Sequence, residues 1–360
     1  MSRVSEIARH GQQIWLDSLS RELLASGRLA SLIGNDGIAG LTSNPAIFQQ
    51  AIARDPAYGA ALKALPAALS EPEARFEALA LPDIRAACDA FTPLYEQSGR
   101  DAGYVSFEVS PSLAHDAGGT VAAARRLWGE IARPNLMIKI PATPAGVEAA
   151  RQCLSEGINV NVTLMFSPQH VLDVFDAYDA GLARRLGGGG DVGQVRAVAS
   201  VFVSRVDTRL DPLLEKAAPE LGGKIAIASA KRAYAEWQRR YQREGEFDQL
   251  RAAGAQPPRL LWASTGTKNS AYRDVLYVES LIGPHTVNTV PEATLNAFRD
   301  HGEAASRLAD GQEEALASLA SLQGLGIDLD EHCQTLQQEG LGQFEQAFAA
   351  LLAQVGGQVS

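Results

Sequence analysis

The sequence predicts an α/β protein folded as a closed (β/α)₈ barrel, a TIM barrel with additional helices. Short apolar runs recur along the chain with helical patterns between them, as is typical of repeated βα units and a parallel sheet. We count about eight such runs, and eight βα units close a barrel. The chain has 360 residues, 46% of them hydrophobic, which suffices for one large core.

The expected strands are rich in β-branched and other apolar residues and are bounded by polar or turn residues. They cover Gln13–Asp17, Ile38–Ser43, Tyr104–Val109, Asn135–Ala142, Ile158–Leu164, Val195–Ser204, Arg259–Ser264 and His285–Val290. The first run is ambiguous, because its residues 14–17 also fit the beginning of a helix.

Helical patterns occupy the segments between these runs. They cover Ser20–Ala30, Pro45–Ala53, Gly119–Ala132, Ala145–Glu156, Pro168–Leu186, Ala271–Leu281 and Glu292–Asp300. Two connections, about 46–103 and 205–258, exceed a simple barrel helix and are rich in helix formers, so we expect helical insertions within one domain spanning 1–360.

The tail, about 300–355, is also helical by pattern. Phe344, Phe348, Leu351 and Leu352 recur at helical spacing and predict an apolar face. We expect a helix laid across the barrel, with this face serving as packing surface.

Composition and charge argue against several functions. The net charge is −10 without a dense Lys/Arg cluster, so we expect no nucleic-acid partner. No apolar run reaches membrane-spanning length and the N-terminus lacks an apolar signal core, so we expect a cytoplasmic protein without a membrane partner. Cys88, Cys153 and Cys333 lack CxxC spacing, and the six histidines form no HxH or HExxH pattern, so no metal site is predicted.

One glycine motif does not support a nucleotide site. Gly188, Gly190 and Gly193 fit GxGxxG, but they follow an expected helix and precede a strand. The dinucleotide-binding motif requires the opposite order, so we interpret these glycines as a flexible loop.

Lys139 is the most unusual residue of the expected strands. It lies within Asn135–Ala142, where Leu136, Ile138 and Ile140 alternate with it along the strand. A near-continuous apolar run is typical of a parallel strand buried on both faces. Burial disfavours an ammonium ion, so we expect a neutral amine that can attack a carbonyl. The alternative is an edge lysine that deters aggregation.

Polar residues also mark the ends of other strands, where a barrel places its chemistry. Asp17 ends the first run, Asn44 follows the second, Glu108 alternates inward on the third, and Asn161 and Thr163 share one face of the fifth. Buried polar side chains must bond to each other, to water or to a ligand. Each one alone could instead cap a helix; their convergence on one mouth favours a site.

Later strands end in hydroxyl and cationic residues. Ser200 and Arg205 close the sixth run, and Ser264, Gly266 and Lys268 follow the seventh. Barrels often bind phosphate near these ends. A capped helix start explains the second segment equally well.

Together these residues make the chain resemble transaldolases, in particular the longer bacterial type. The resemblance spans nearly the whole chain through motifs at 40–48 (GLTSNPAIF), 106–109 (SFEV), 138–143 (IKIPAT), 157–164 (GINVNVTL), 199–205 (ASVFVSR) and 286–294 (TVNTVPEAT). It implies a (β/α)₈ enzyme of the pentose phosphate pathway. Such an enzyme moves a dihydroxyacetone unit from sedoheptulose 7-phosphate to glyceraldehyde 3-phosphate, giving erythrose 4-phosphate and fructose 6-phosphate, without a cofactor.

The resemblance also implies roles for individual residues. Lys139 would be the Schiff-base lysine, Asp17 the acid/base of carbon–carbon cleavage, and Glu108 with Thr163 the pair that handles a catalytic water. The residues implied to bind substrate are Asn44, Asn161 and Ser200 for the dihydroxyacetone hydroxyls, and Arg205, Ser264 and Lys268 for the phosphate.

The cation after strand seven departs from the shorter branch, which has an arginine two residues after the serine. Here Lys268 lies four residues after Ser264, and lysine is a point charge rather than a fork. Two alternatives stay open: a Schiff-base aldolase that releases free dihydroxyacetone, and a non-catalytic protein that binds sugar phosphates. The sequence leaves monomer and homodimer equally open.

Overall fold

The computed structural model describes residues 2–357 and contains a closed barrel of eight parallel strands in sequence order. The strands are β1 (Gln12–Asp17), β2 (Ile38–Thr42), β3 (Tyr104–Glu108), β4 (Leu136–Pro141), β5 (Val160–Met165), β6 (Ala197–Phe202), β7 (Arg259–Ala263) and β8 (Thr286–Val290). β8 pairs with β1 and completes the cylinder. The predicted (β/α)₈ barrel is confirmed, including the ambiguous first strand.

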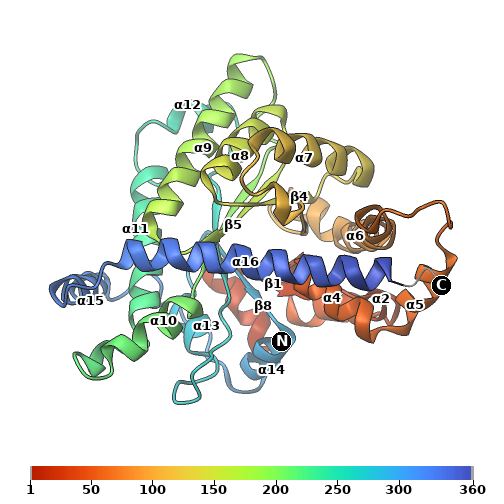
Figure 1. Ribbon diagram of the computed structural model, residues 1–360. Helices are drawn as coiled ribbons and strands as arrows, with labels where there is room; N and C mark the ends of the chain where they lie inside the picture. The colour runs from red at the N-terminus through yellow and green to blue at the C-terminus, as the bar shows by residue number, and fades with distance from the viewer. Residues whose placement is uncertain (1, 358–360) are drawn as a thin grey trace.

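Helices surround the barrel (Figure 1). They are α1 (Arg3–Glu6), α2 (Arg21–Ala25), α3 (Arg28–Ser31), α4 (Pro45–Arg54), α5 (Pro56–Ala64), α6 (Pro72–Gln97), α7 (Ala117–Ile131), α8 (Pro144–Glu156), α9 (Pro168–Gly187), α10 (Ser204–Leu214), α11 (Ile225–Tyr241), α12 (Asp248–Ala252), α13 (Leu276–Ser280), α14 (Glu292–His301), α15 (Gln312–Gly324) and α16 (Leu329–Gly356). Short helices of other types are the 3₁₀ helices η1 (Ile7–His10), η3 (Pro111–Leu113) and η4 (Pro219–Leu221) and the π-helix η2 (Leu32–Asp36).

Several of these helices begin where the sequence provides a cap followed by proline. Asn44, Thr143 and Ser167 each accept a backbone N–H of the first turn, and proline follows each of them. Proline suits the first helical position, because the N–H it lacks would have no partner there. The strand-to-helix turns after β2, β4 and β5 are therefore determined locally.

Two predicted helices were wrong in extent. The segment predicted as Ser20–Ala30 forms α2 and α3, separated by Gly27 in the left-handed region at φ 77°. The segment predicted from Ala271 to Leu281 is helical only in α13. Residues before α13 form a turn instead, because the Asn269 side chain accepts the Ala271 N–H and so competes with helical bonding.

The interior of the barrel is filled by side chains from alternate strand positions. Trp15 of β1 and Tyr104 of β3 stack with ring centroids 6.5 Å apart. Gly40 of β2 makes room for them, because a Cβ there would lie 2.6 Å from the Trp15 ring. Nearer the mouth, Glu108, Lys139 and Asn161 pair in register across β3, β4 and β5. These three side chains therefore lie at one level of the barrel.

The last helix, α16, crosses the barrel in front of the strands (Figure 1) and contacts α4, α6, α10 and β5. The Gln337 amide donates to the carbonyls of Ala142 (3.0 Å) and Leu164 (2.9 Å) at the ends of β4 and β5. Phe344 and Phe348 are buried on the same face. The predicted helical C-terminal segment is confirmed. Within residues 2–357, no helix combines the length and apolar character that a membrane span requires.

Candidate active site

Lys139 lies at the centre of the barrel mouth and faces Glu108 from the neighbouring strand. Only 5% of Lys139 and 8% of Glu108 are exposed. The Lys139 Nζ lies 3.3 Å from Glu108 Oε2 and donates to the Ser43 carbonyl at 3.2 Å. Burial raises the pKa of Glu108 to about 7, although the nearby Lys139 opposes that rise. The carboxyl group is therefore able to exchange a proton with its neighbour near neutral pH.

Asp17 stands at the end of β1 in a chain of hydroxyl groups. The Thr42 hydroxyl donates to Asp17 Oδ1 at 2.7 Å, and the Thr289 hydroxyl lies 2.6 Å from that of Thr42. A hydroxyl has one proton, so Thr42 accepts from Thr289 while it donates to Asp17. Burial raises the Asp17 pKa, and the charge of Lys139 and the Thr42 bond partly counter this rise. The carboxyl group is thus held in one orientation with an elevated proton affinity.

Asn161 and Ser200 bond directly to each other. The Ser200 hydroxyl donates to Asn161 Oδ1 at 2.6 Å, and Asn161 Nδ2 donates to Ser106 Oγ at 3.0 Å. All three are buried. Their polar atoms line the wall beside Lys139, where a polyhydroxylated ligand would find donors and acceptors already positioned. Asn159, two residues earlier on the same face, instead bonds to the backbone at Pro134 and Leu136.

Thr163 lies one alternation nearer the mouth than Asn161. Its buried hydroxyl has no hydrogen-bond partner among the described residues, and Glu108 Oε1 has none either, whereas Oε2 faces Lys139. The next residue, Leu164, has φ 59°, and the β5–β6 register shifts between Val162 and Met165. Such irregularities re-aim side chains and are common beside active sites. Unpartnered polar atoms here fit a bound water or ligand.

Asn44 caps a helix and also lies beside the candidate site. Its Oδ1 caps α4 by accepting the Ile47 N–H at 3.0 Å. Asn44 is half-buried and lines a small hollow together with Glu108 and Phe348. The cap orients the residue, while its side-chain amide N–H₂ is available to a ligand.

The three remaining hydroxyl and cationic positions differ in burial and in their contacts. Arg205 is half-buried with its guanidinium stacked 5.3 Å from the centre of the Phe202 ring, and burial lowers the pKa of this group. Ser264 adopts φ 54°, and its hydroxyl lies 3.1 Å from that of Ser204 at the start of α10. Lys268 is exposed in the loop after β7, without an ion pair or hydrogen bond in the described part of the chain.

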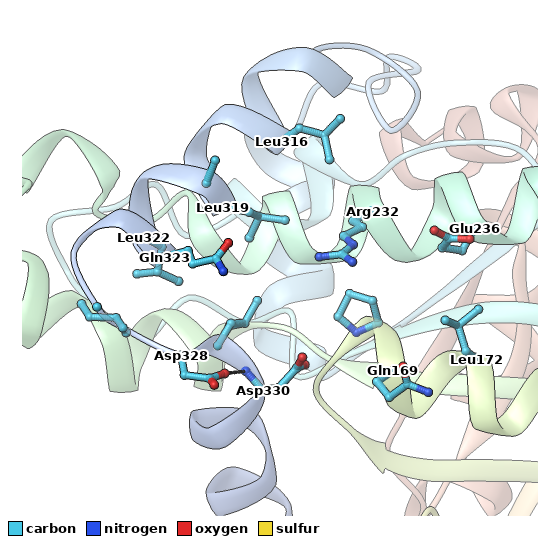
Figure 2. Close-up of a pocket in the computed structure, with 15 residues that line it drawn as sticks. Gln169, Leu172, Arg232, Glu236, Leu316, Leu319, Leu322, Gln323, Asp328 and Asp330 are labelled. Carbon is cyan, nitrogen blue, oxygen red and sulfur yellow. Dashed lines mark hydrogen bonds between the residues drawn. The ribbon is translucent and has the colours of Figure 1, made fainter.

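A separate cavity of about 690 Å³ lies between α9, α11, α15 and the start of α16 (Figure 2). Its lining includes Arg232 and Glu236 from α11 and Leu316 and Leu319 from α15, together with Gln169. None of the candidate site residues lines it. The convergence of titratable groups is at the barrel mouth, and we therefore assign the chemistry there.

The family comparison agrees with this geometry. The profile of the family described as Transaldolase/Fructose-6-phosphate aldolase matches residues 14–355. The chain belongs to this family. The match runs from β1 into α16, so every candidate residue of this transaldolase-family protein lies within it.

Individual relatives match over their full length. The chain is 49% identical over 360 residues to a protein named transaldolase from Thiobacillus denitrificans, covering 99% of this chain and all of the relative. It is 51% identical over 353 residues to a transaldolase from Neisseria gonorrhoeae, covering 98% and 99% of the two chains. A protein named transaldolase 2 from Nostoc is 44% identical over 374 residues, covering 100% and 98%.

The tertiary structure of this family member adds residues that sequence reasoning missed. Thr289 joins the hydroxyl chain to Asp17, and the Ser43 carbonyl accepts from Lys139. Phe344 of α16, expected to be packing surface, places its ring centre 5.6 Å from the Lys139 Nζ. Thr289 and Ser43 lie at polar strand ends, which is a weak signal in the sequence. No local pattern identified Phe344. Among residues 2–357, no three His, Cys, Asp or Glu side chains gather into a metal-binding group.

Proposed function

We propose that this protein is a transaldolase. It would transfer a dihydroxyacetone unit from sedoheptulose 7-phosphate to glyceraldehyde 3-phosphate, giving erythrose 4-phosphate and fructose 6-phosphate in the non-oxidative pentose phosphate pathway. Family membership and the names of the full-length relatives support the reaction. The observation that carries the proposal is a buried lysine amine 3.3 Å from a carboxylate, beside Asp17, in a barrel mouth.

The first step would form a Schiff base on Lys139. Glu108 accepts a proton from Lys139, the resulting amine attacks the ketose carbonyl carbon, and the carbonyl oxygen becomes a hydroxyl as a proton moves to it from the nitrogen. Glu108 then donates a proton, through a water held with Thr163, as that hydroxyl leaves as water and an iminium forms. The Thr163 hydroxyl and Glu108 Oε1, which have no partner among the described residues, support this assignment.

The second step would break the carbon–carbon bond. Asp17 accepts the proton of the C4 hydroxyl, the C3–C4 electron pair moves toward the iminium, and the aldose phosphate departs. A three-carbon enamine stays bound, and an acceptor aldehyde reverses the sequence. The raised Asp17 pKa suits a group that must accept and return this proton.

Other polar groups would hold the substrate. Asn44, Asn161 and Ser200 would bind the dihydroxyacetone hydroxyls, and Arg205 and Ser264 would bind the phosphate. The half-buried Arg205 guanidinium supports a phosphate there, because it makes no hydrogen bond or ion pair within the described chain. Lys268 is exposed and lies farther along the loop, so its assignment as a phosphate ligand has the least structural support. A cytoplasmic location stays a prediction.

Trapping tests the Schiff base directly. With fructose 6-phosphate and borohydride, mass spectrometry should find a reduced three-carbon adduct on Lys139. K139A should neither trap nor transfer. Unmodified wild-type protein would contradict the mechanism, and substrate binding without trapping would indicate a non-catalytic binding protein.

The role of Asp17 has its own test. D17A should still form the Schiff base with fructose 6-phosphate, but it should fail to cleave the bond. Equal loss of both steps would contradict the assignment. With fructose 6-phosphate as donor, product analysis with and without erythrose 4-phosphate separates transfer from an aldolase that releases free dihydroxyacetone.

A further inference from the structure

The C-terminal helix α16 passes directly over the reacting amine. Gln337 fixes it to the ends of β4 and β5. One turn later, a Cβ at Gly340 would lie 3.4 Å from an Arg205 guanidinium nitrogen. One further turn on, the Phe344 ring centre lies 5.6 Å from the Lys139 Nζ. This face of α16 thus forms part of the site's enclosure.

The enclosure is almost complete at Lys139. Lys139 and Phe344 are 5% and 7% exposed, and the polar atoms around the amine belong to Glu108 and the Ser43 carbonyl. Phe344 provides the apolar part of the surroundings of the Lys139 amine. An aromatic ring within about 6 Å of an ammonium group attracts it, but the same ring also occupies space that water would otherwise fill.

Water matters because the reaction leaves an enamine waiting for a second substrate. If bulk water reaches it, carbon C3 of the enamine takes up a proton and an iminium forms. Water then adds to that iminium, the C–N bond breaks, and dihydroxyacetone and the free Lys139 amine are released. Transfer therefore requires that the enamine be kept from solvent until an aldehyde arrives.

We propose that Phe344 is a positioning residue of α16 that excludes bulk water from the enamine on Lys139 and thereby favours transfer over release of dihydroxyacetone. This inference rests on the proposed function. The water that Glu108 and Thr163 would hold serves a different step, the proton transfer during Schiff-base formation. Phe344 determines what happens to the intermediate afterwards.

The test is a partition ratio. Free dihydroxyacetone released from fructose 6-phosphate without acceptor is measured against transfer from fructose 6-phosphate to erythrose 4-phosphate, which gives sedoheptulose 7-phosphate. F344A should raise the ratio of release to transfer about tenfold, which corresponds to about 1.4 kcal/mol in the balance of the two barriers. Borohydride should still trap the Lys139 adduct in this variant.

Matched variants separate water exclusion from simple loss of packing. L351A removes a fully buried side chain from the same helix, farther from the site, and should lower stability while leaving the ratio unchanged. F344V and F344T have nearly equal volume and differ in polarity, so the ratio should be higher for F344T. F344V and F344T also test the inference if F344A does not fold.

Each outcome has one meaning. An unchanged ratio in F344A, or equal ratios in F344V and F344T, would overturn the inference while wild-type transfer stayed intact. A rise in L351A equal to that in F344A would also overturn it. Failure of the proposed function would differ, because the wild-type protein itself would neither transfer nor be trapped.

Discussion

Replacing Glu108 with Gln tests the proton exchange at the centre of the site. Glutamine has nearly the same shape but cannot ionise, so it cannot accept a proton from Lys139 or return one to the carbinolamine. Losing a general acid–base group typically lowers the rate by about 10²- to 10⁴-fold. We expect a fall of this size in kcat/KM for transfer, with the fold retained.

The size of the pKa shift determines the pH dependence. Burial raises the Glu108 pKa from 4.5 to about 7, which is about 3 kcal/mol in favour of the protonated form. With an ordinary pKa, about 0.3% of the carboxyl groups would hold a proton at pH 7; with the raised pKa about half do. Below pH 7 Glu108 is protonated and cannot accept from Lys139. Wild-type kcat/KM should therefore rise as the pH increases through about 7.

The assay is the pH profile of kcat/KM for transfer from pH 5 to 9. E108Q should lack the acid limb near pH 7 as well as losing rate. Glu96 lies exposed on α6, so E96Q serves as the matched control and should follow the wild-type profile. Wild-type rates in E108Q, or an acid limb that survives the substitution, would refute the reasoning.

Three further substitutions test stability. Burial raises the pKa of Asp207, a residue of α10, to about 7; because this lies above its unfolded value, its contribution to stability is full below about pH 4 and is lost as the pH rises through 7. Between pH 5 and 8.5 the free energy of unfolding, measured in urea, should therefore fall by about 3 kcal/mol less in D207N than in wild type. Parallel pH curves for the two proteins would contradict this. In α8, a Cβ at Gly146 would lie 1.8 Å from the Pro141 carbonyl oxygen, so G146A should cost about 3 kcal/mol or more. Gly129 of α7 faces open space, so G129A should instead gain about 0.5–1 kcal/mol in thermal unfolding, and equal effects at the two glycines would rule out the steric argument.

The strands could be predicted because their signal is local. Each expected run overlaps one strand of the barrel with ends shifted by a few residues, since apolar alternation depends only on neighbours along the chain. The segments around Gly27 and Asn269 could not be predicted in the same way. Their backbone depends on a left-handed glycine and on a side chain that bonds back to its own loop, and both override helical propensity.

Parts of the site were equally accessible from the sequence. Strand alternation directed Lys139, Glu108 and Asn161 to the same interior, and the register of β3, β4 and β5 places them at one level. Asn44 was expected to bind substrate and also caps α4. Lys268 was also expected to bind substrate; it is exposed in the loop after β7, and its role stays a prediction.

By itself the sequence determined how many βα units close the barrel, which strand positions point inward and where capped helices begin. These properties follow from periodicity and from contacts within a few residues. Only the tertiary structure decided which side chains meet. Thr289 reaches Thr42 across 247 residues because β8 closes on β1, and Phe344 reaches Lys139 because α16 crosses the mouth. Such meetings depend on the register of distant elements, which no local pattern encodes.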